Sequence, residues 1–172
     1  MDDWRRERLN IVGRISADKG RTWSEQFIMT PSPGYNIMHN DKLVQLSTGR
    51  IIAPVEYQAR WPSTKDHSSY IARVFYSDDE GYSWQKSKSD VDMDPHEAQE
   101  PHVVELKDGR LMMIFRTYSG FVGRAYSMDQ GETWSRGEMV KELNLSPYAG
   151  AVTVNRIPST GDLLLIRATG GK

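Results

Sequence analysis

The chain has 172 residues, a formal net charge of −1 and no cysteine. The length fits one domain, the near-neutral charge gives no support to a nucleic-acid or anionic-membrane role, and the lack of cysteine excludes disulfides and thiolate metal sites. No apolar run approaches transmembrane length and the first residues lack the apolar stretch of a signal peptide, so the cellular compartment stays unassigned.

Short apolar segments separated by turn residues predict an all-β chain. Three of the turns contain Gly49, Gly109 and Gly161, each between two apolar segments, and each predicts a hairpin. A long polar loop is expected at residues 58–68. In chain order the predicted strands are residues 9–15, 40–46, 50–57, 69–76, 101–106, 110–117, 121–126, 151–157 and 162–168.

A second kind of turn repeats the octet Ser-x-Asp-x-Gly-x-(Thr/Ser)-Trp at residues 16–23, 77–84 and 127–134. We expect the Asp to accept hydrogen bonds from backbone N–H groups one and two residues further on, the Gly to supply a positive φ, and the hydroxyls to bond to nearby backbone. The Trp is expected to anchor the turn to a core. The structural residues are Asp18, Gly20, Trp23, Asp79, Gly81, Trp84, Asp129, Gly131 and Trp134.

Octets and glycine hairpins alternate with a period of about 50–60 residues, which gives four strands per repeat and predicts β-propeller blades. The expected units are a half blade at about residues 9–35, blades at about 36–95 and 96–145, and a half blade at about 146–172. Closed propellers have about four to eight blades. Three explanations therefore stay open: a fragment of a longer protein, pairing with a second polypeptide, or two copies closing a six-bladed ring, which predicts self-association.

Strand direction predicts where a site can lie. The glycine hairpins and the octets must share one end of the blades. The starts of the inner strands and the ends of their neighbours share the opposite end. That opposite end gathers Asn40, Glu100 and Ala151 with Glu56, Arg116 and either Arg167 or Ala168. The octet carboxylates are therefore expected to be structural rather than catalytic.

The octet resembles the Asp box of the sialidase (neuraminidase) superfamily, whose six-bladed propellers remove terminal sialic acid, and the resemblance extends from about residue 9 to residue 166. It implies that Glu100 is the catalytic base to a Tyr nucleophile and that Arg116 binds the substrate carboxylate, for which a guanidinium fork is well suited. Asn40, Glu56, Tyr118 and Arg167 are expected to line the same site. Glu100 as a turn residue and Arg116 as a solvated strand-end charge are the alternative.

Other parts of the family pattern do not match. Arg156-Ile157-Pro158 resembles the motif of the family's first arginine, but it lies beside the Gly161 turn at the wrong end. The Asp acid is expected upstream of this chain and the Tyr downstream of it, and Tyr148 does not match the Tyr motif. The expected function is a sialidase-like glycoside hydrolase acting on a sialoside or related glycan, inactive as this chain alone. The alternative is a non-catalytic propeller that binds glycan or protein. No cofactor and no metal site are expected, since His39, His67, His96 and His102 lack ligand spacing.

Overall fold

The structure is a computed structural model that describes residues 9–31, 34–39, 41–58, 70–144 and 150–167. These residues form strands and turns and no helix, and so include no helix that could cross a membrane. The strands are β1 (Val12–Gly13), β2 (Phe27–Ile28), β3 (Tyr35–Ile37), β4 (Val44–Gln45), β5 (Ile51–Gln58), β6 (Tyr70–Ser77), β7 (Gln85–Lys86), β8 (Gln99–Glu105), β9 (Leu111–Arg116), β10 (Phe121–Ser127), β11 (Glu138–Asn144), β12 (Val152–Arg156) and β13 (Leu163–Arg167).

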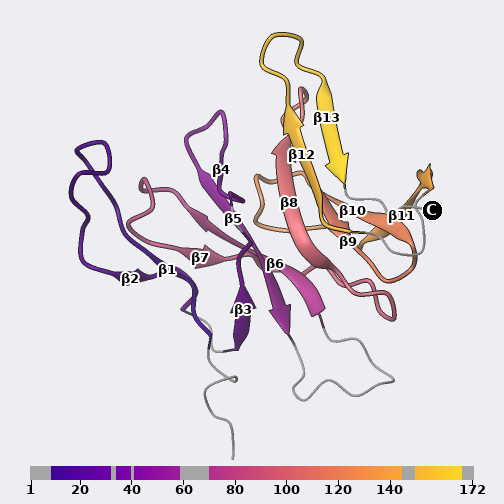
Figure 1. Cartoon of the computed structure of the whole chain (residues 1–172), viewed down its shortest axis with the longest axis horizontal. Helices are drawn as coiled ribbons and strands as arrows, with labels where there is room; N and C mark the ends of the chain where they lie inside the picture. The colour runs from indigo at the N-terminus through magenta and orange to yellow at the C-terminus, as the bar shows by residue number, and fades with distance from the viewer. Residues whose placement is uncertain (1–8, 32–33, 40, 59–69, 145–149, 168–172) are drawn as a thin grey trace, which may run out of the picture.

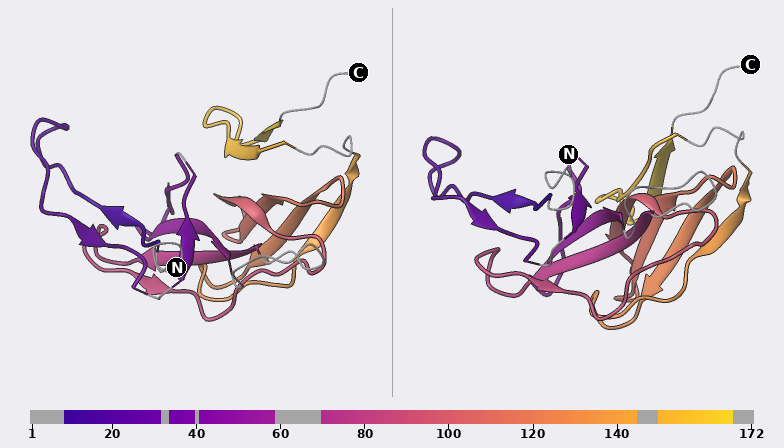
Figure 2. Two further views of the ribbon diagram at one scale, coloured as in Figure 1. Left: turned by 60° about the horizontal axis from the view of Figure 1, so that its bottom comes forward. Right: turned by 90° about the horizontal axis from the view of Figure 1, so that it is seen from below.

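The strands form four antiparallel sheets that follow one another along the chain (Figures 1 and 2). The first sheet pairs β1 with β2, and the last pairs β12 with β13. Between them lie a sheet in which β3 and β4 both pair with β5, followed by β6 and β7, and a sheet in the order β8, β9, β10, β11. Sheets of consecutive antiparallel strands are the blades that the repeats predict, so the all-β, partial-propeller fold class is confirmed.

The inner strand of the second sheet differs from the prediction. The sequence predicts one strand at residues 40–46, whereas β3 and β4 pair with opposite ends of β5, with Ile37 opposite Glu56 and Val44 opposite Ile52. The chain leaves the sheet between them, where Asp41 has a φ of 54°. A non-glycine residue in the left-handed region interrupts a ladder, and alternation of apolar residues does not reveal it in advance.

The core lies between adjacent sheets, because both faces of the central strands are buried. Along β9, Met113 and Phe115 pack toward the second sheet, whereas Met112 and Ile114 pack toward the last one. Side chains alternate between the two faces of a strand, so a strand of uninterrupted apolar residues serves two interfaces at once. This stacking fixes neighbouring sheets against each other and thereby places the strand ends.

The three Asp boxes share one hydrogen-bond pattern. In the third, the Asp129 carboxylate accepts the N–H and the hydroxyl of Thr133 at 2.8 and 2.6 Å, and Ser127 Oγ accepts the Gly131 N–H at 2.8 Å. The predicted acceptance from N–H groups one and two residues on is therefore wrong. The residue before each Gly is left-handed and each box Gly also has a positive φ, which turns the residue four positions on toward the carboxylate. The bonds hold the pKa of Asp129 below its ordinary value, against the effect of its burial.

The Trp residues of the boxes divide by burial. Trp134 is 8% exposed and packs among core residues of the second and third sheets, and Trp84 packs against the core between the first two. Both donate their ring N–H to the carbonyl of the box glycine. Trp23 is 59% exposed, so the prediction that it anchors its turn to a core is wrong. Since the other two lie against the sheet that precedes their own, Trp23 in the first sheet has no such partner among the described residues.

Arg50 shows that the glycine hairpins and the Asp boxes lie at the same end of the sheets. Its guanidinium bonds to Asp78 of its own blade at 2.6 Å and to the Gln130 carbonyl of the next blade at 3.1 Å. Arg156 lies at this end too, since it donates to the carbonyls of Glu105 and Gly161. The opposite end therefore carries the starts of the inner strands.

Candidate functional site

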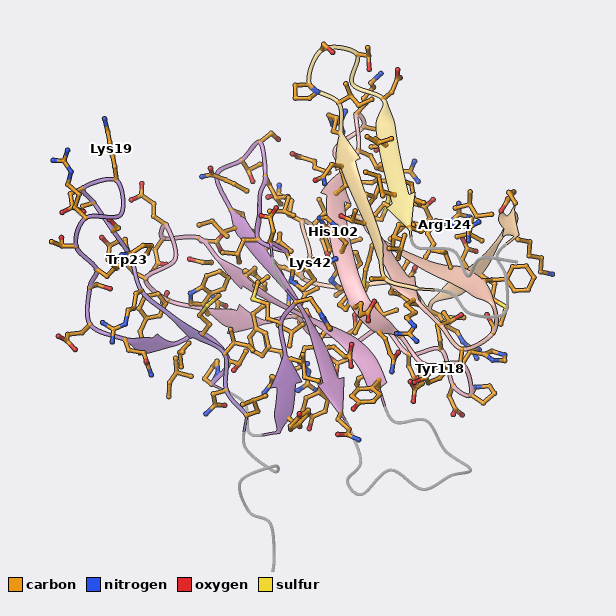
Figure 3. The ribbon with its side chains drawn as sticks, viewed as in Figure 1. Lys19, Trp23, Lys42, His102, Tyr118 and Arg124 are labelled. Atoms are coloured by element: carbon orange, nitrogen blue, oxygen red, sulfur yellow. The ribbon has the colours of Figure 1, made fainter. Side chains whose placement is uncertain are left out.

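The end opposite the Asp boxes brings together Glu56 from β5, Glu100 from β8 and Arg116 from β9. In Figure 3, Tyr118 lies toward the lower edge of the molecule and Lys19 of the first box toward the upper edge. Arg116 Nη1 donates to Glu100 Oε1 at 3.3 Å, and the two side chains are 30% and 17% exposed. Strand direction predicts these residues at one end, and the structure brings them into contact.

This pair has unused hydrogen-bonding capacity. Glu100 Oε2 and Arg116 Nε are both buried, and neither has a hydrogen-bond partner among the described residues. A buried polar atom without a partner costs about 1–3 kcal/mol, so such atoms mark places where a ligand or water completes the bonding. The free carboxylate oxygen can take up a proton, and the free N–H can bind an acceptor.

Glu100 has an unusual backbone. Its φ is 51°, and the pairing of β8 with β9 shifts register between Gln99 and His102, so Glu100 and Pro101 form a bulge in the inner strand. Bulges next to functional sites redirect a side chain, and a left-handed non-glycine residue costs about 1–3 kcal/mol. Pro101 offers no N–H for the ladder, which favours the bulge at this position.

Glu56 holds this bulge from the neighbouring blade. It is 5% exposed, its Oε2 accepts the Glu100 N–H at 2.9 Å, and His39 Nε2 lies 3.2 Å from the same oxygen. The position of Glu56 near the end of its strand predicts that it lines the site. The structure places its carboxylate against the backbone of Glu100, where it can orient the Glu100 side chain.

A cavity of about 360 Å³ opens beside Glu100, between the second, third and last sheets. Its polar wall is formed by His39, Lys42, Glu100, Thr153 and Arg167. Arg167, predicted from its place at the end of its strand, therefore reaches the same cavity as Glu100. Tyr118 is 61% exposed, and its ring centroid lies 5.6 Å from Arg116 Cζ. Asn40, Tyr148 and Ala168 lie outside the described residues.

Sequence reasoning missed Lys42 and His102, which are buried at 8% and 4% exposure. Burial lowers the pKa of Lys42, while Glu100 and Asp41 act in the opposite direction. Burial, with a contribution from Lys42, lowers the pKa of His102 to about 4. The Thr153 hydroxyl lies 2.5 Å from His102 Nδ1 and the Val154 N–H points at the same nitrogen, which suits a neutral imidazole that accepts at Nδ1.

The arrangement combines a carboxylate with a free oxygen, several cationic side chains and a cavity of sugar-binding size. Such a site can bind an anionic ligand and can exchange a proton with it. Within the described ranges, no three His, Asp or Glu side chains come together as a metal site requires.

Comparison with known proteins assigns the family. The sequence pattern of the BNR repeat-like domain matches residues 1–170. An anhydrosialidase from Macrobdella decora is 28% identical over 152 residues, which cover 84% of this chain and 19% of the relative. A sialidase from Clostridium perfringens is 26% identical over 168 residues, covering 80% of this chain and 43% of the relative. The chain thus spans less than half the length of both.

Solved structures agree on the fold. The leech intramolecular trans-sialidase, crystallised with 2,7-anhydro-Neu5Ac, superposes with a TM-score of 0.69 at 27% identity, over 92% of this chain and 24% of that protein. The shared part is the arc of antiparallel sheets described above. The chain therefore belongs to the family of BNR repeat-like domains, within the sialidase superfamily, and it forms part of a sialidase-type β-propeller.

Proposed function

We propose that this chain supplies part of the active site of a sialidase-like glycoside hydrolase that removes a terminal acidic sugar. The contact between Glu100 and Arg116 carries the proposal, because each residue keeps a buried polar atom that has no partner among the described residues, and Glu100 lines the cavity. The relatives named sialidase and anhydrosialidase support the same class of substrate.

Each residue has a physical role in this proposal. The Arg116 guanidinium binds the carboxylate of the sugar through paired charge-assisted hydrogen bonds. Glu100 accepts the proton of a Tyr nucleophile, since a phenol with a pKa near 10 attacks poorly until a base takes its proton. Glu56 orients Glu100 through the backbone N–H. The Tyr and the acid come from blades outside this chain, so the chain alone binds the sugar without cleaving it.

The test compares hydrolysis of a fluorogenic sialoside by the complete ring with that by its Arg116→Ala variant. Loss of a charge-assisted bidentate contact costs a few kcal/mol, so we expect turnover to fall by roughly a hundredfold or more. Arg110→Ala is the matched control, because Arg110 pairs with Asp108 at the Asp-box end and its loss should leave turnover unchanged.

Equal turnover by the Arg116→Ala variant and the unchanged protein would contradict this site assignment. A complete ring that binds the sialoside without turning it over would instead indicate a non-catalytic glycan-binding propeller. The chain on its own gives a simpler readout, since binding of N-acetylneuraminic acid that weakens in Arg116→Ala separates binding from hydrolysis.

A further inference from the structure

Lys42 is a cation in an unusual position. It lies in the segment between β3 and β4, where the inner strand leaves the sheet, directly after the left-handed Asp41. The residue is 8% exposed, although lysine is among the residues least often buried. Figure 3 shows Lys42 near the centre of the molecule, close to His102 in that view. The ammonium group is therefore held inside the protein, on the wall of the cavity that Glu100 also lines.

The described contacts of this ammonium leave most of its hydrogen-bonding capacity unused. Its one hydrogen bond runs to the Val152 carbonyl at 3.5 Å, and no carboxylate of the described residues lies within 4 Å. An ammonium has three donors, and a buried charge normally has a close partner of opposite charge. A carbonyl at 3.5 Å is a weak acceptor, so the local protein groups do not explain why a lysine is buried here.

The surroundings of Lys42 favour an anion from outside the chain. Lys42 lines the 360 Å³ cavity together with Glu100 and Arg167. Glu100 and Asp41 act on it only at longer range, Glu100 is itself paired with Arg116, and His102 beside it stays neutral at pH 7 because burial lowers its pKa to about 4. The wall formed by Lys42 and Arg167 is thus positive, and it has room for a carboxylate.

We propose that Lys42 is a binding residue for the acid group of the ligand, a cation in addition to Arg116, which pairs with Glu100 of the same cavity wall. The inference rests on the proposed function, because it assumes that the cavity receives an acidic sugar. It assigns selectivity for charged over neutral sugars to a lysine from the second sheet. A ligand carboxylate there gains a charge-assisted bond in a site that excludes much of the water.

The experiment measures binding of N-acetylneuraminic acid and of its methyl ester by calorimetric titration. Lys42→Met keeps the length of the side chain and removes its charge. We expect this variant to bind the acid at least about tenfold more weakly and the uncharged ester equally well. Lys107→Met is the matched control, since Lys107 Nζ also reaches a carbonyl of the last two-stranded sheet, that of Thr160 at 3.4 Å, but at the opposite end.

Each result has a distinct meaning. Unchanged binding of the acid by Lys42→Met, or equal loss for acid and ester, overturns the role of Lys42 and leaves the proposed function standing if Arg116→Ala still weakens binding. Failure of the unchanged protein to bind the acid overturns both. If Lys42→Met does not fold, the side-chain NMR resonances of Lys42 in the unchanged protein decide. These resonances should shift on titration with the acid and stay unchanged with the ester. If they do not shift with the acid, the inference is overturned.

Discussion

The three Trp residues of the Asp boxes provide a stability test in which the sequence motif is constant and the burial of the Trp varies. Replacement of a buried Trp by Ala costs about 3–5 kcal/mol, from lost burial and the cavity that remains. Trp134 is 8% exposed, so we expect Trp134→Ala to lower the free energy of unfolding by that full amount. Trp23 is 59% exposed, so Trp23→Ala should cost about 1 kcal/mol or less. Trp84, partly buried, should fall between them.

Urea unfolding followed by circular dichroism measures the three variants in one series. The urea midpoint should be highest for Trp23→Ala, intermediate for Trp84→Ala and lowest for Trp134→Ala. The dependence of the unfolding free energy on urea concentration should stay similar, since a shift of midpoint at constant slope reports a change in stability. We assign most of the difference to packing between sheets, because the bonds of the box Asp and Ser are the same in all three turns. The ring N–H bond that Trp84 and Trp134 donate to the box glycine carbonyl contributes about 1 kcal/mol, less than the burial of the ring. Equal losses for Trp23→Ala and Trp134→Ala would refute it, and would mean that the turn itself determines the contribution of its Trp.

Two further predictions concern pH and association. Burial lowers the pKa of His102 to about 4 in the folded chain, whereas a histidine in the unfolded chain has a pKa of about 6.5. Below about pH 6.5 the unfolded chain therefore takes up a proton before the folded chain does. The free energy of unfolding should fall between about pH 6.5 and pH 4, by about 2 kcal/mol after allowance for solvent screening. Urea unfolding at pH 7 and pH 4.5 should show this loss, and His102→Gln should remove it; an equal loss in the variant contradicts the assignment. The outer sheets β1–β2 and β12–β13 expose large apolar side chains, so we propose that the chain self-associates and expect light scattering to give a mass above 19.7 kDa. A compact monomer would contradict that proposal.

The sequence predicts the blades well because their determinants are local. Each Asp box closes its turn with groups that lie within eight residues of one another, as the bonds of Asp79 to Ser77 and Ser83 show. Alternation then assigns the strands on either side. The burial of the box Trp, in contrast, depends on residues far away in the sequence. Trp23 and Trp134 stand in the same motif, and only the presence of a neighbouring sheet separates an exposed side chain from a core residue.

The candidate site also contains residues that the sequence predicts and a residue that it does not. Strand direction alone places Glu100 and Arg116 at one end, because each strand of an antiparallel sheet reverses the one before it. Strand direction does not predict the burial of Lys42, since in sequence it is a charged residue of a polar turn. Its burial depends on Val152, 110 residues further along the chain, and on the interruption of the inner strand between β3 and β4. Neither cause leaves a signal in the residues around Lys42.

Backbone strain separates the two ends of the sheets. Among the described residues, six non-glycine residues have a positive φ. Lys19, Glu80 and Gln130 occupy one equivalent position in the three Asp boxes, where the hydrogen bonds of the box and the following Gly stabilise the turn. The others, Asp41, Glu97 and Glu100, have no such motif and lie at the entry to the inner strands.

Conformations that cost about 1–3 kcal/mol each persist only where the surrounding structure imposes them. Three features hold Glu100 in this conformation: the Glu56 carboxylate that accepts its N–H, Pro101 directly after it, and β9, which is packed between two sheets. The fold therefore uses its regular turns at one end to fix the blades, and the fixed blades hold Glu100 at the other end in a conformation that its own sequence does not favour. That division is expected of a site whose carboxylate must be aimed before the ligand arrives.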